Sequence, residues 1–432
     1  MTDLRAAARE AARRFGTPTY LYDLGTLERD AAAVAAAFPD PWLRLYALKA
    51  NGLPALLRGL PGAGFGASAV SGGELALAAR AGFSPPMTAL EGIGKTPADL
   101  QRAVAMAEAR SPLLWVSLES ADEAAALAEL VRARAGRSVG AAAGALRVDV
   151  LVRLNPQVRP ETHRGLAVGA AESKFGVLPE ELGDVIAAGG GADGPLRWRG
   201  IHVHVGSQLG AVDAWRSAFR VGLRVLGLQR AALPDADTLD VGSGFPVDMG
   251  EPGSVPGPEL FADAAREELA ALPADARPAR LAIEPGRAIV ARCGWLLARV
   301  LHVRDREQTL IVLDAGMTEL IRPALYGAEH PLMALTSLGR PVATGDEATG
   351  DEATADWATV RVDGPICEST DRLGSARLPP MRRGDLVAIG VAGAYGSSMA
   401  SSYNGRPRPA EVAWDGQRLE MLRRRGSART LP

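Results

Sequence analysis

Apolar runs followed by helical patterns recur along the first two thirds of the chain, and they predict alternating strands and helices. Between the runs, apolar residues stand three and four positions apart, as in SADEAAALAELVRARAG at 120–136. Eight strand-then-helix units are typical of a (β/α)8 barrel, whereas a doubly wound sheet, the alternative, usually has fewer strands. The expected strands lie at 43–48, 64–70, 86–92, 112–119, 148–155, 200–206, 238–242 and 280–286.

The pattern changes after about residue 290. Short β-branched stretches such as TLIVLDAG and WATVRVDGP alternate there with Gly, Pro and Asp turns, which predicts an antiparallel β domain. The segment 337–356 contains the tandem repeat ATGDEATGDEAT. Its acidic, small and polar composition predicts an exposed, mobile insertion.

Composition narrows the class of protein. With 48 basic and 50 acidic residues the net charge is -2, which argues against a nucleic-acid or membrane-surface partner. The two cysteines form no motif, the charged N-terminal helix lacks the apolar core of a signal peptide, and no apolar run reaches the ~20 residues of a membrane span. We therefore expect a soluble cytoplasmic protein.

Unusual residues gather where the expected barrel strands end, which is where barrel enzymes place their active sites. A buried histidine or a Gly-rich turn has an ordinary structural explanation when it stands alone. That explanation does not account for so many of them at the same end of successive strands. They are Lys49 and Asn51 after the first strand, VSGGEL (70–75) after the second, His202 and His204 at the sixth, DVGSGFP (240–246) after the seventh and EPGR (284–287) after the eighth.

Lys49 is one of only three lysines in the chain, and its setting suggests a carbonyl cofactor held as a Schiff base. Gly-rich strand ends let backbone N–H groups approach a phosphate, and Arg287 adds a charge-assisted contact. These features together predict pyridoxal 5'-phosphate. Glu284 is then placed to keep the ring nitrogen protonated, and His204 to stack on the ring face.

Two other classes of enzyme fit parts of the pattern less well. The HVH of 202–204 is similar to paired histidines that bind zinc in metal-dependent hydrolase barrels, but the remaining three histidines do not follow the strands that would complete such a site. No GxSxG element occurs, which removes the simplest serine hydrolase.

From YALKAN to SSYNGRPRPAEV, the chain resembles the fold-type III, alanine-racemase-like pyridoxal-phosphate decarboxylases, and within them the branch that acts on diaminopimelate. The resemblance implies a barrel at 28–288 and a β domain that joins residues 1–27 to residues 289–432. It also implies a homodimer with shared active sites. The activity that it implies is decarboxylation of meso-2,6-diaminopimelate to L-lysine, in lysine biosynthesis.

The resemblance also assigns roles to residues. Lys49 would carry the cofactor, Glu284 would pair with the ring nitrogen and His204 would stack on the ring. The GPICESTD segment (364–371) is similar to a loop from the second subunit, in which Cys367 would be the proton donor and Glu368 would bind the distal amine. The phosphate would lie among Ser207, Gly244, Gly286 and Arg287, and substrate would contact Arg287, Arg322, Tyr326, Glu368 and Tyr395, the last also near the cofactor. Cys293 is expected to be a buried structural residue.

Three departures from the family pattern surround the expected cofactor. Ser68 stands where an Asp is usual, EGIGKT replaces the usual His-Gly-Asn segment after the third strand, and Ser243 interrupts a glycine triplet. Lys95 either supplies a missing polar contact there or faces solvent. These departures leave open a related substrate, namely ornithine or lysine, carboxynorspermidine or a carrier-bound glutamyl group.

Overall fold

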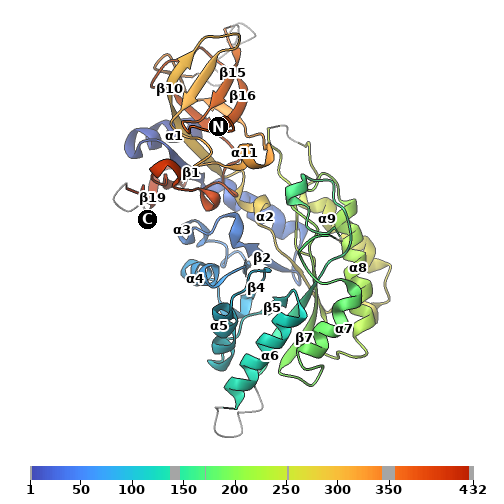
Figure 1. Cartoon of the computed structure of the whole chain (residues 1–432). Coiled ribbons are helices and arrows are strands. Elements are labelled where there is room, and N and C mark those ends of the chain that lie inside the picture. Colours follow the sequence, from blue (N-terminus) through green and yellow to red (C-terminus); the bar gives the residue numbers. More distant parts are fainter. Residues whose placement is uncertain (1, 137–145, 171, 251–252, 343–355, 428–432) are drawn as a thin grey trace. The chain divides into compact units, whose positions relative to one another are not determined.

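The computed structural model describes residues 2–136, 146–170, 172–250, 253–342 and 356–427. The chain divides into two compact units, coloured along the sequence in Figure 1. The barrel unit comprises residues 31–247 and 253–288, and the β unit comprises residues 1–30, 248–252 and 289–432. Residues 343–355, within the expected insertion at 337–356, lie outside the described residues.

The barrel unit contains a closed barrel of eight parallel strands in chain order, as the sequence predicted. Each strand pairs with the next, and β2 pairs with β9 to close the ring. The parallel pairing brings the carboxyl ends of all eight strands to one end of the barrel. The strands are β2 (Leu43–Ala47), β3 (Gly66–Ala69), β4 (Thr88–Leu90), β5 (Trp115–Leu118), β6 (Val148–Leu154), β7 (Leu196–Val203), β8 (Thr238–Asp240) and β9 (Arg280–Ile283).

The barrel strands read as nearly continuous apolar runs because both of their faces are buried. One cluster of fully buried side chains draws on five different strands, which gives the barrel a packed interior rather than a pore. Its members are Leu45, Ala89, Trp115, Leu151 and Ala282.

Helices follow the strands, and polar caps fix where several of them begin. Ser71 and Ser120 accept hydrogen bonds from the backbone N–H groups of Glu74 and Glu123, and Thr96 forms a capping box with Asp99. No helix in the described part of the chain is long and apolar enough to cross a membrane. The helices of this region are α2 (Leu24–Ala37), α3 (Pro54–Leu57), α4 (Gly72–Ala81), α5 (Pro97–Glu108), α6 (Ala121–Ala135), α7 (Leu182–Ala188), α8 (Asp213–Gln229), α9 (Pro258–Ala270) and α10 (Arg287–Val290).

The β unit is built on a sheet in which β1 lies between β10 and β18. The expectation of an antiparallel domain that takes in the N-terminal segment is confirmed for most pairs, but β1 with β18 and β11 with β15 are parallel. The strands are β1 (Thr19–Asp23), β10 (Gly294–Arg304), β11 (Leu310–Leu313), β12 (Leu332–Ala334), β15 (Ala358–Asp363), β16 (Arg372–Leu378), β17 (Leu386–Ile389), β18 (Ala410–Trp414) and β19 (Leu419–Arg423). A separate two-stranded ribbon pairs β13 (Thr336–Ser337) with β14 (Arg340–Pro341). The unit also contains α1 (Thr2–Phe15) and α11 (Arg322–Tyr326).

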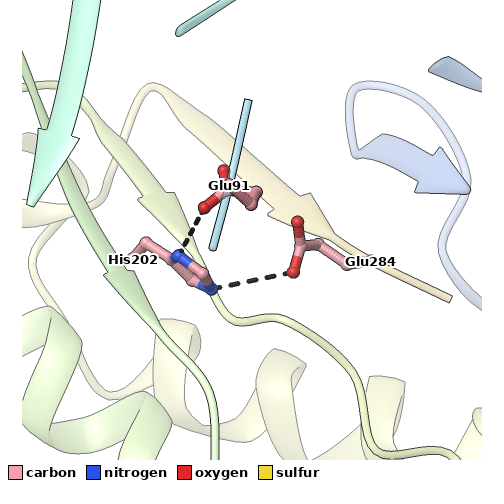
Figure 2. A group of neighbouring side chains, drawn as sticks. All are labelled: Glu91, His202 and Glu284. Atoms are coloured by element: carbon pink, nitrogen blue, oxygen red, sulfur yellow. Dashed lines mark ion pairs between the residues drawn. The ribbon is translucent and has the colours of Figure 1, made fainter. Parts of the chain in front are cut away.

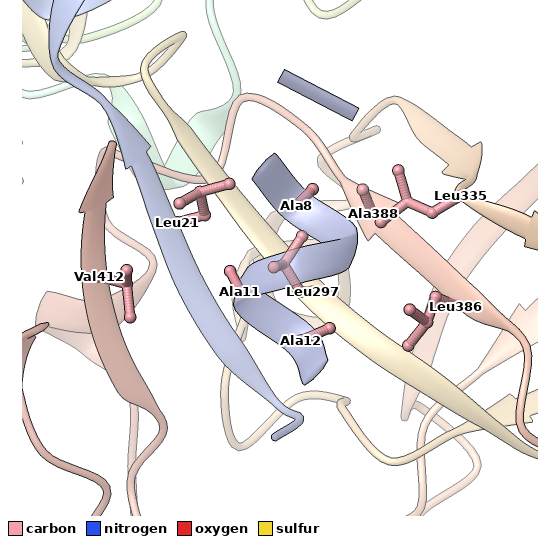
Figure 3. Packing of buried hydrophobic residues seen from close by; sticks show 9 residues of the cluster. All are labelled: Ala8, Ala11, Ala12, Leu21, Leu297, Leu335, Leu386, Ala388 and Val412. Carbon is pink, nitrogen blue, oxygen red and sulfur yellow. The ribbon is translucent and has the colours of Figure 1, made fainter. Parts of the chain in front are cut away.

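Small side chains attach α1 to the sheet of the β unit. Figure 3 shows Ala8, Ala11 and Ala12 of α1 facing leucines of the sheet, among them Leu21 and Leu297. Alanines three and four positions apart lie on one face of a helix, so α1 approaches the sheet closely along that face.

Candidate active site

Lys49 lies at the carboxyl end of the first barrel strand. β2 continues into the 3-10 turn η1 (Leu48–Ala50), whose first and last residues are buried while Lys49 is exposed. The backbone N–H of Ala47 donates to the carbonyl of Pro285 at 3.0 Å, which ties this turn to the segment after the eighth barrel strand. The turn therefore directs the amine away from the core at the end where the sequence predicted chemistry.

Glu284 follows β9 and is 7% exposed. Its backbone N–H donates to the carbonyl of Gly242 at 2.8 Å. Burial raises the pKa of Glu284 above its usual range and the charge of Glu91 adds to this, whereas the charges of His202 and Lys49 and a hydrogen bond from Ser68 oppose it. Ser68, the first departure from the family pattern, thus stabilises the ionised form of Glu284.

His204 stands just beyond the end of β7 and is half-buried. The backbone N–H of Ser243 approaches its Nδ1 at 3.4 Å. Gly242, with φ +57°, leaves room for the ring, because a Cβ there would lie 2.4 Å from the same nitrogen. Burial, followed by the charges of Lys49 and Arg153, lowers the pKa of His204 well below its usual range, so the ring is neutral.

Lys49, Glu284 and His204 therefore share one end of the barrel, where the charge of Lys49 acts on both of the other groups. An exposed amine, a buried carboxylate and a neutral imidazole are suited to carbonyl chemistry. The three side chains that the sequence selected for this role are brought together.

Two of the four expected phosphate residues, Ser207 and Arg287, contact each other. Arg287 begins α10, is 4% exposed, and donates from Nη2 to Ser207 Oγ at 2.9 Å. Gly244, with φ +105°, packs against the backbone carbonyl of Gly206, where a Cβ would lie 2.8 Å from that oxygen. Gly286 packs against the alanines of the Lys49 turn. Serine, arginine and closely approached backbone offer the donors that a phosphate requires.

A second set of buried side chains at the base of this site was not predicted from the sequence. Glu91, which directly follows the third barrel strand, pairs through Oε2 with Nδ1 of His202 at 2.9 Å. Trp115 Nε1 donates to the other oxygen of Glu91 at 2.8 Å. The sequence singled out both residues, His202 as part of a metal-like HVH and Glu91 within the EGIGKT departure, but nothing in the pattern indicated that they meet.

Lys95 does not face solvent, so that alternative is wrong. Its side chain is 0% exposed and pairs with Glu123 at 3.1 Å, and it also donates to the carbonyl of Gly92. Glu123 in turn accepts a hydrogen bond from the backbone N–H of Glu119 at 2.8 Å. Lys95 therefore fastens the loop after β4 to the start of α6.

The remaining predicted residues belong to the β unit. Arg322 and Tyr326 are the first and last residues of α11, four positions apart and so on one face of the helix. Arg322 is buried and Tyr326 is half-buried. Tyr395, also half-buried, has φ +58°, a backbone conformation that non-glycine residues rarely adopt. Cys293 is buried, as expected.

The loop at 364–371 presents Cys367 and Glu368, both exposed, and a buried Asp371 holds it in place. Asp371 accepts hydrogen bonds from the backbone N–H groups of Met317 at 2.6 Å and Ile366 at 2.7 Å. Because one carboxylate accepts hydrogen bonds from two separate segments, it anchors the loop to the body of the β unit.

Two residues that sequence analysis left without a role contact this loop. Tyr403 donates its hydroxyl to Glu368 Oε1 at 2.7 Å, and Asn404 Nδ2 lies 3.4 Å from Cys367 Sγ. Both belong to the SSYNGRPR stretch that carries the family resemblance, and this was the available signal. The contacts place the thiol and the carboxylate beside polar partners.

Comparisons with known proteins agree with this geometry. The family model described as "Pyridoxal-dependent decarboxylase, pyridoxal binding domain" matches residues 24–291. The diaminopimelate decarboxylase of Deinococcus radiodurans is 36% identical over 98% of this chain and 96% of its own length, and that of Aquifex aeolicus is 33% identical over 96% and 91%. A solved diaminopimelate decarboxylase from Helicobacter pylori, complexed with L-lysine, superposes with a TM-score of 0.83 at 28% identity and covers 97% of each chain.

Proposed function

Since the chain belongs to the family of pyridoxal-dependent decarboxylases, we propose that it converts meso-2,6-diaminopimelate to L-lysine and CO2 with pyridoxal 5'-phosphate as cofactor. Relatives named diaminopimelate decarboxylase match nearly the whole chain, and a solved neighbour of that name holds L-lysine. The observation in this chain that carries the proposal is that Lys49, His204 and Glu284 share one end of the closed barrel.

The residues at this end fit the cofactor. Among the described residues, none donates a hydrogen bond to Glu284 Oε1, although the side chain is buried. A protonated ring nitrogen would satisfy that oxygen, since a buried carboxylate oxygen without a donor is costly. Arg287 and Ser207 would hold the phosphate, with Gly244 and Gly286 allowing its close approach, and Lys49 would hold the aldehyde carbon.

When bound, pyridoxal phosphate supplies an electron sink for the electrons released as CO2 leaves. Glu284 would hold a proton at the ring nitrogen, which is why an acid is needed at this position. His204, being neutral, would cover one face of the ring without adding positive charge. The substrate's amine would displace the amine of Lys49 from the cofactor. Lys49 would take that place again when the product leaves.

The β unit would supply the proton donor and the substrate contacts. We expect Cys367 to deliver a proton to the carbon that lost CO2, held near its position by the amide of Asn404. Glu368 would bind the distal amine, and Arg322, with Tyr326 on the same helical face, the distal carboxylate. Tyr395 would contact both cofactor and substrate.

We further propose a homodimer in which the loop at 364–371 of one copy completes the barrel site of the other. The family resemblance is the source of this expectation. Exposure of both Cys367 and Glu368 in a single chain is consistent with a loop that works against another surface. Sedimentation equilibrium of the purified protein would test the dimer. Mixing a Lys49→Ala copy with a Cys367→Ala copy would test sharing, because only mixed dimers would regain an intact site.

Two experiments test the activity. Release of CO2 would be measured with meso-diaminopimelate and, separately, with ornithine, lysine and carboxynorspermidine. CO2 release from diaminopimelate and from none of the other substrates supports the proposal. CO2 release from another substrate, with none from diaminopimelate, refutes the substrate assignment. Borohydride reduction followed by peptide mapping would locate the cofactor on Lys49. Lys49→Ala should abolish the labelled peptide, whereas Lys174→Ala, which alters an exposed lysine of the same unit, should retain it.

A further inference from the structure

The two ring nitrogens of His202 face two different buried carboxylates at the base of the proposed cofactor site. Figure 2 shows one nitrogen directed toward Glu91 and the other toward Glu284. The Nδ1 atom is 2.9 Å from Glu91 Oε2, and the Nε2 atom is 3.7 Å from Glu284 Oε2. All three side chains are less than a tenth exposed, at 2%, 3% and 7% for His202, Glu91 and Glu284.

This geometry indicates the protonation state of the ring. A neutral imidazole has one N–H group and one lone pair, so one of the two carboxylates would face a lone pair. A doubly protonated imidazolium directs one N–H group toward each of the two carboxylates. Burial alone would lower the pKa of His202, but the charge and hydrogen bond of Glu91, with smaller contributions from Glu284 and Asp240, raise it to about 9.

The orientation of Glu91 is fixed from two sides. Trp115 Nε1 occupies one carboxylate oxygen at 2.8 Å, which leaves the other for His202. Ser117 Oγ lies 3.0 Å from the same ring nitrogen as Glu91. Burial alone would raise the pKa of Glu91, but His202 and the Trp115 hydrogen bond lower it to about 2. Glu91 is therefore a carboxylate over the working pH range.

We propose that Glu91 and His202 are positioning residues that keep Glu284 ionised and directed toward the ring nitrogen of the cofactor. The proposal rests on the proposed function, because it takes that nitrogen as the partner of Glu284. Glu91 acts only through His202, and neither residue needs to touch the cofactor.

Glu284 needs such a cation because its surroundings favour the protonated form. Burial and the charge of Glu91 raise its pKa, and His202, Lys49 and Ser68 oppose them. In the proposed function the amine of Lys49 is committed to the cofactor. His202 is then the cation that stays beside Glu284 throughout the reaction.

The other charged groups around His202 do not replace this cation. Asp240 on β8 is buried, and burial with the charge of Glu284 raises its pKa well above its usual range; an acid supplies no positive charge in either protonation state. Arg153 on β6 pairs with Glu119 at 2.9 Å. Lys95, which acts on Glu91, pairs with Glu123, and His204 is neutral.

The test begins with the apoprotein, so that it does not depend on the cofactor. Nitrogen-15 NMR of labelled histidines would report whether both nitrogens of His202 carry protons at pH 7.5, with the signal assigned by its loss in His202→Gln. We expect double protonation and a titration midpoint near 9. In Glu91→Gln the midpoint should fall, because Glu91 supplies the largest contributions that oppose burial. Glu129→Gln, an exposed glutamate of the same unit, should leave it unchanged.

The second measurement uses pyridoxal 5'-phosphate labelled with nitrogen-15 in the ring. In the wild-type protein its signal should lie at the protonated position, and in both Glu91→Gln and His202→Gln it should move toward the neutral position. A ring signal unchanged in both variants overturns the inference even when the cofactor is bound to Lys49. A singly protonated His202 in the wild-type apoprotein also overturns it.

Failure of the proposed function gives a different result. A doubly protonated His202 in a protein that does not bind pyridoxal phosphate would refute the proposed function. The ion pair between His202 and Glu91 would still be supported. Stoichiometric zinc in the purified protein, bound among these three side chains, would overturn the inference, because the metal would take the place of the imidazolium proton.

Discussion

The change Gly242→Ala tests whether the position of His204 depends on the absence of a side chain at residue 242. A Cβ at this glycine would lie 2.4 Å from Nδ1 and 3.0 Å from Cγ of His204. The backbone has φ +57°, which costs an alanine about 1–2 kcal/mol. Crowding of the ring adds about 1–3 kcal/mol if the ring stays in place.

Gly191→Ala is the matched control. Gly191 has φ +74°, and a Cβ added there would meet no atom within 4 Å beyond its neighbours in the chain. Gly191→Ala should therefore lose stability only through the unfavourable backbone conformation. Urea unfolding of the two apoproteins should differ by about 1–3 kcal/mol, with Gly242→Ala the less stable. If the His204 ring moves away from the new methyl group, the difference in unfolding free energy will be smaller and the cofactor will bind more weakly.

Cofactor binding would be followed by titrating each apoprotein with pyridoxal phosphate and recording its absorbance. Loss of a stacked ring contact is worth about 0.5–1.5 kcal/mol, so we expect the Kd of Gly242→Ala to rise roughly two- to twelvefold. Gly191→Ala should bind as the wild type does. Equal stability of the two variants together with unchanged cofactor binding would refute the reasoning.

Three further predictions concern stability. Asp371→Ala removes the acceptor for two backbone N–H groups of the β unit and should lower the free energy of unfolding by about 2–4 kcal/mol, measured in urea. Lys95→Met leaves Glu123 without its cation and should cost about 3–5 kcal/mol, also measured in urea. The pKa of His202 is raised to about 9 and that of Glu91 lowered to about 2, so their pair stabilises fully between about pH 4.5 and 6.5. The stability difference between wild type and His202→Gln should therefore shrink by about 3 kcal/mol as pH rises from 6.5 through 9.

Each of these predictions has an opposing result. An Asp371→Ala protein as stable as wild type would show that the loop does not depend on this carboxylate. For Lys95, the control is Lys174→Met, which changes an exposed lysine and should stay within about 0.5 kcal/mol of wild type. A stability difference for His202→Gln that stays constant with pH would mean that the ring is not charged in the folded protein.

The sequence predicted the barrel and the gathering of Lys49, His204 and Glu284 because both follow from one rule. Parallel strands in a barrel all end on the same side, so residues that follow them must converge. The rule needs only strand positions, and apolar runs supply these. It does not say which side chains touch across the barrel.

The pairing of Glu91 with His202 illustrates that limit. Glu91 follows β4 and His202 lies in β7, and these strands are not neighbours in the barrel, so the contact depends on side-chain reach across the interior. The parallel pairing of β1 with β18 was equally out of reach, because the order and direction of distant strands depend on the packing of the whole sheet. The burial of Lys95 depended on a partner, Glu123, that lies on a different element.

The place of β1 in its sheet has a consequence for synthesis on the ribosome. Both of its neighbours, β10 and β18, emerge only after every barrel strand has been made. The nascent chain must therefore carry β1 with two unpaired edges while the barrel forms, and unpaired edges invite pairing with other chains. The helix α1, whose alanines later pack on the sheet, is the part of the chain already available to shield one face of that strand. Chains that terminate early, before β18, would be released with an open edge and should be prone to aggregation.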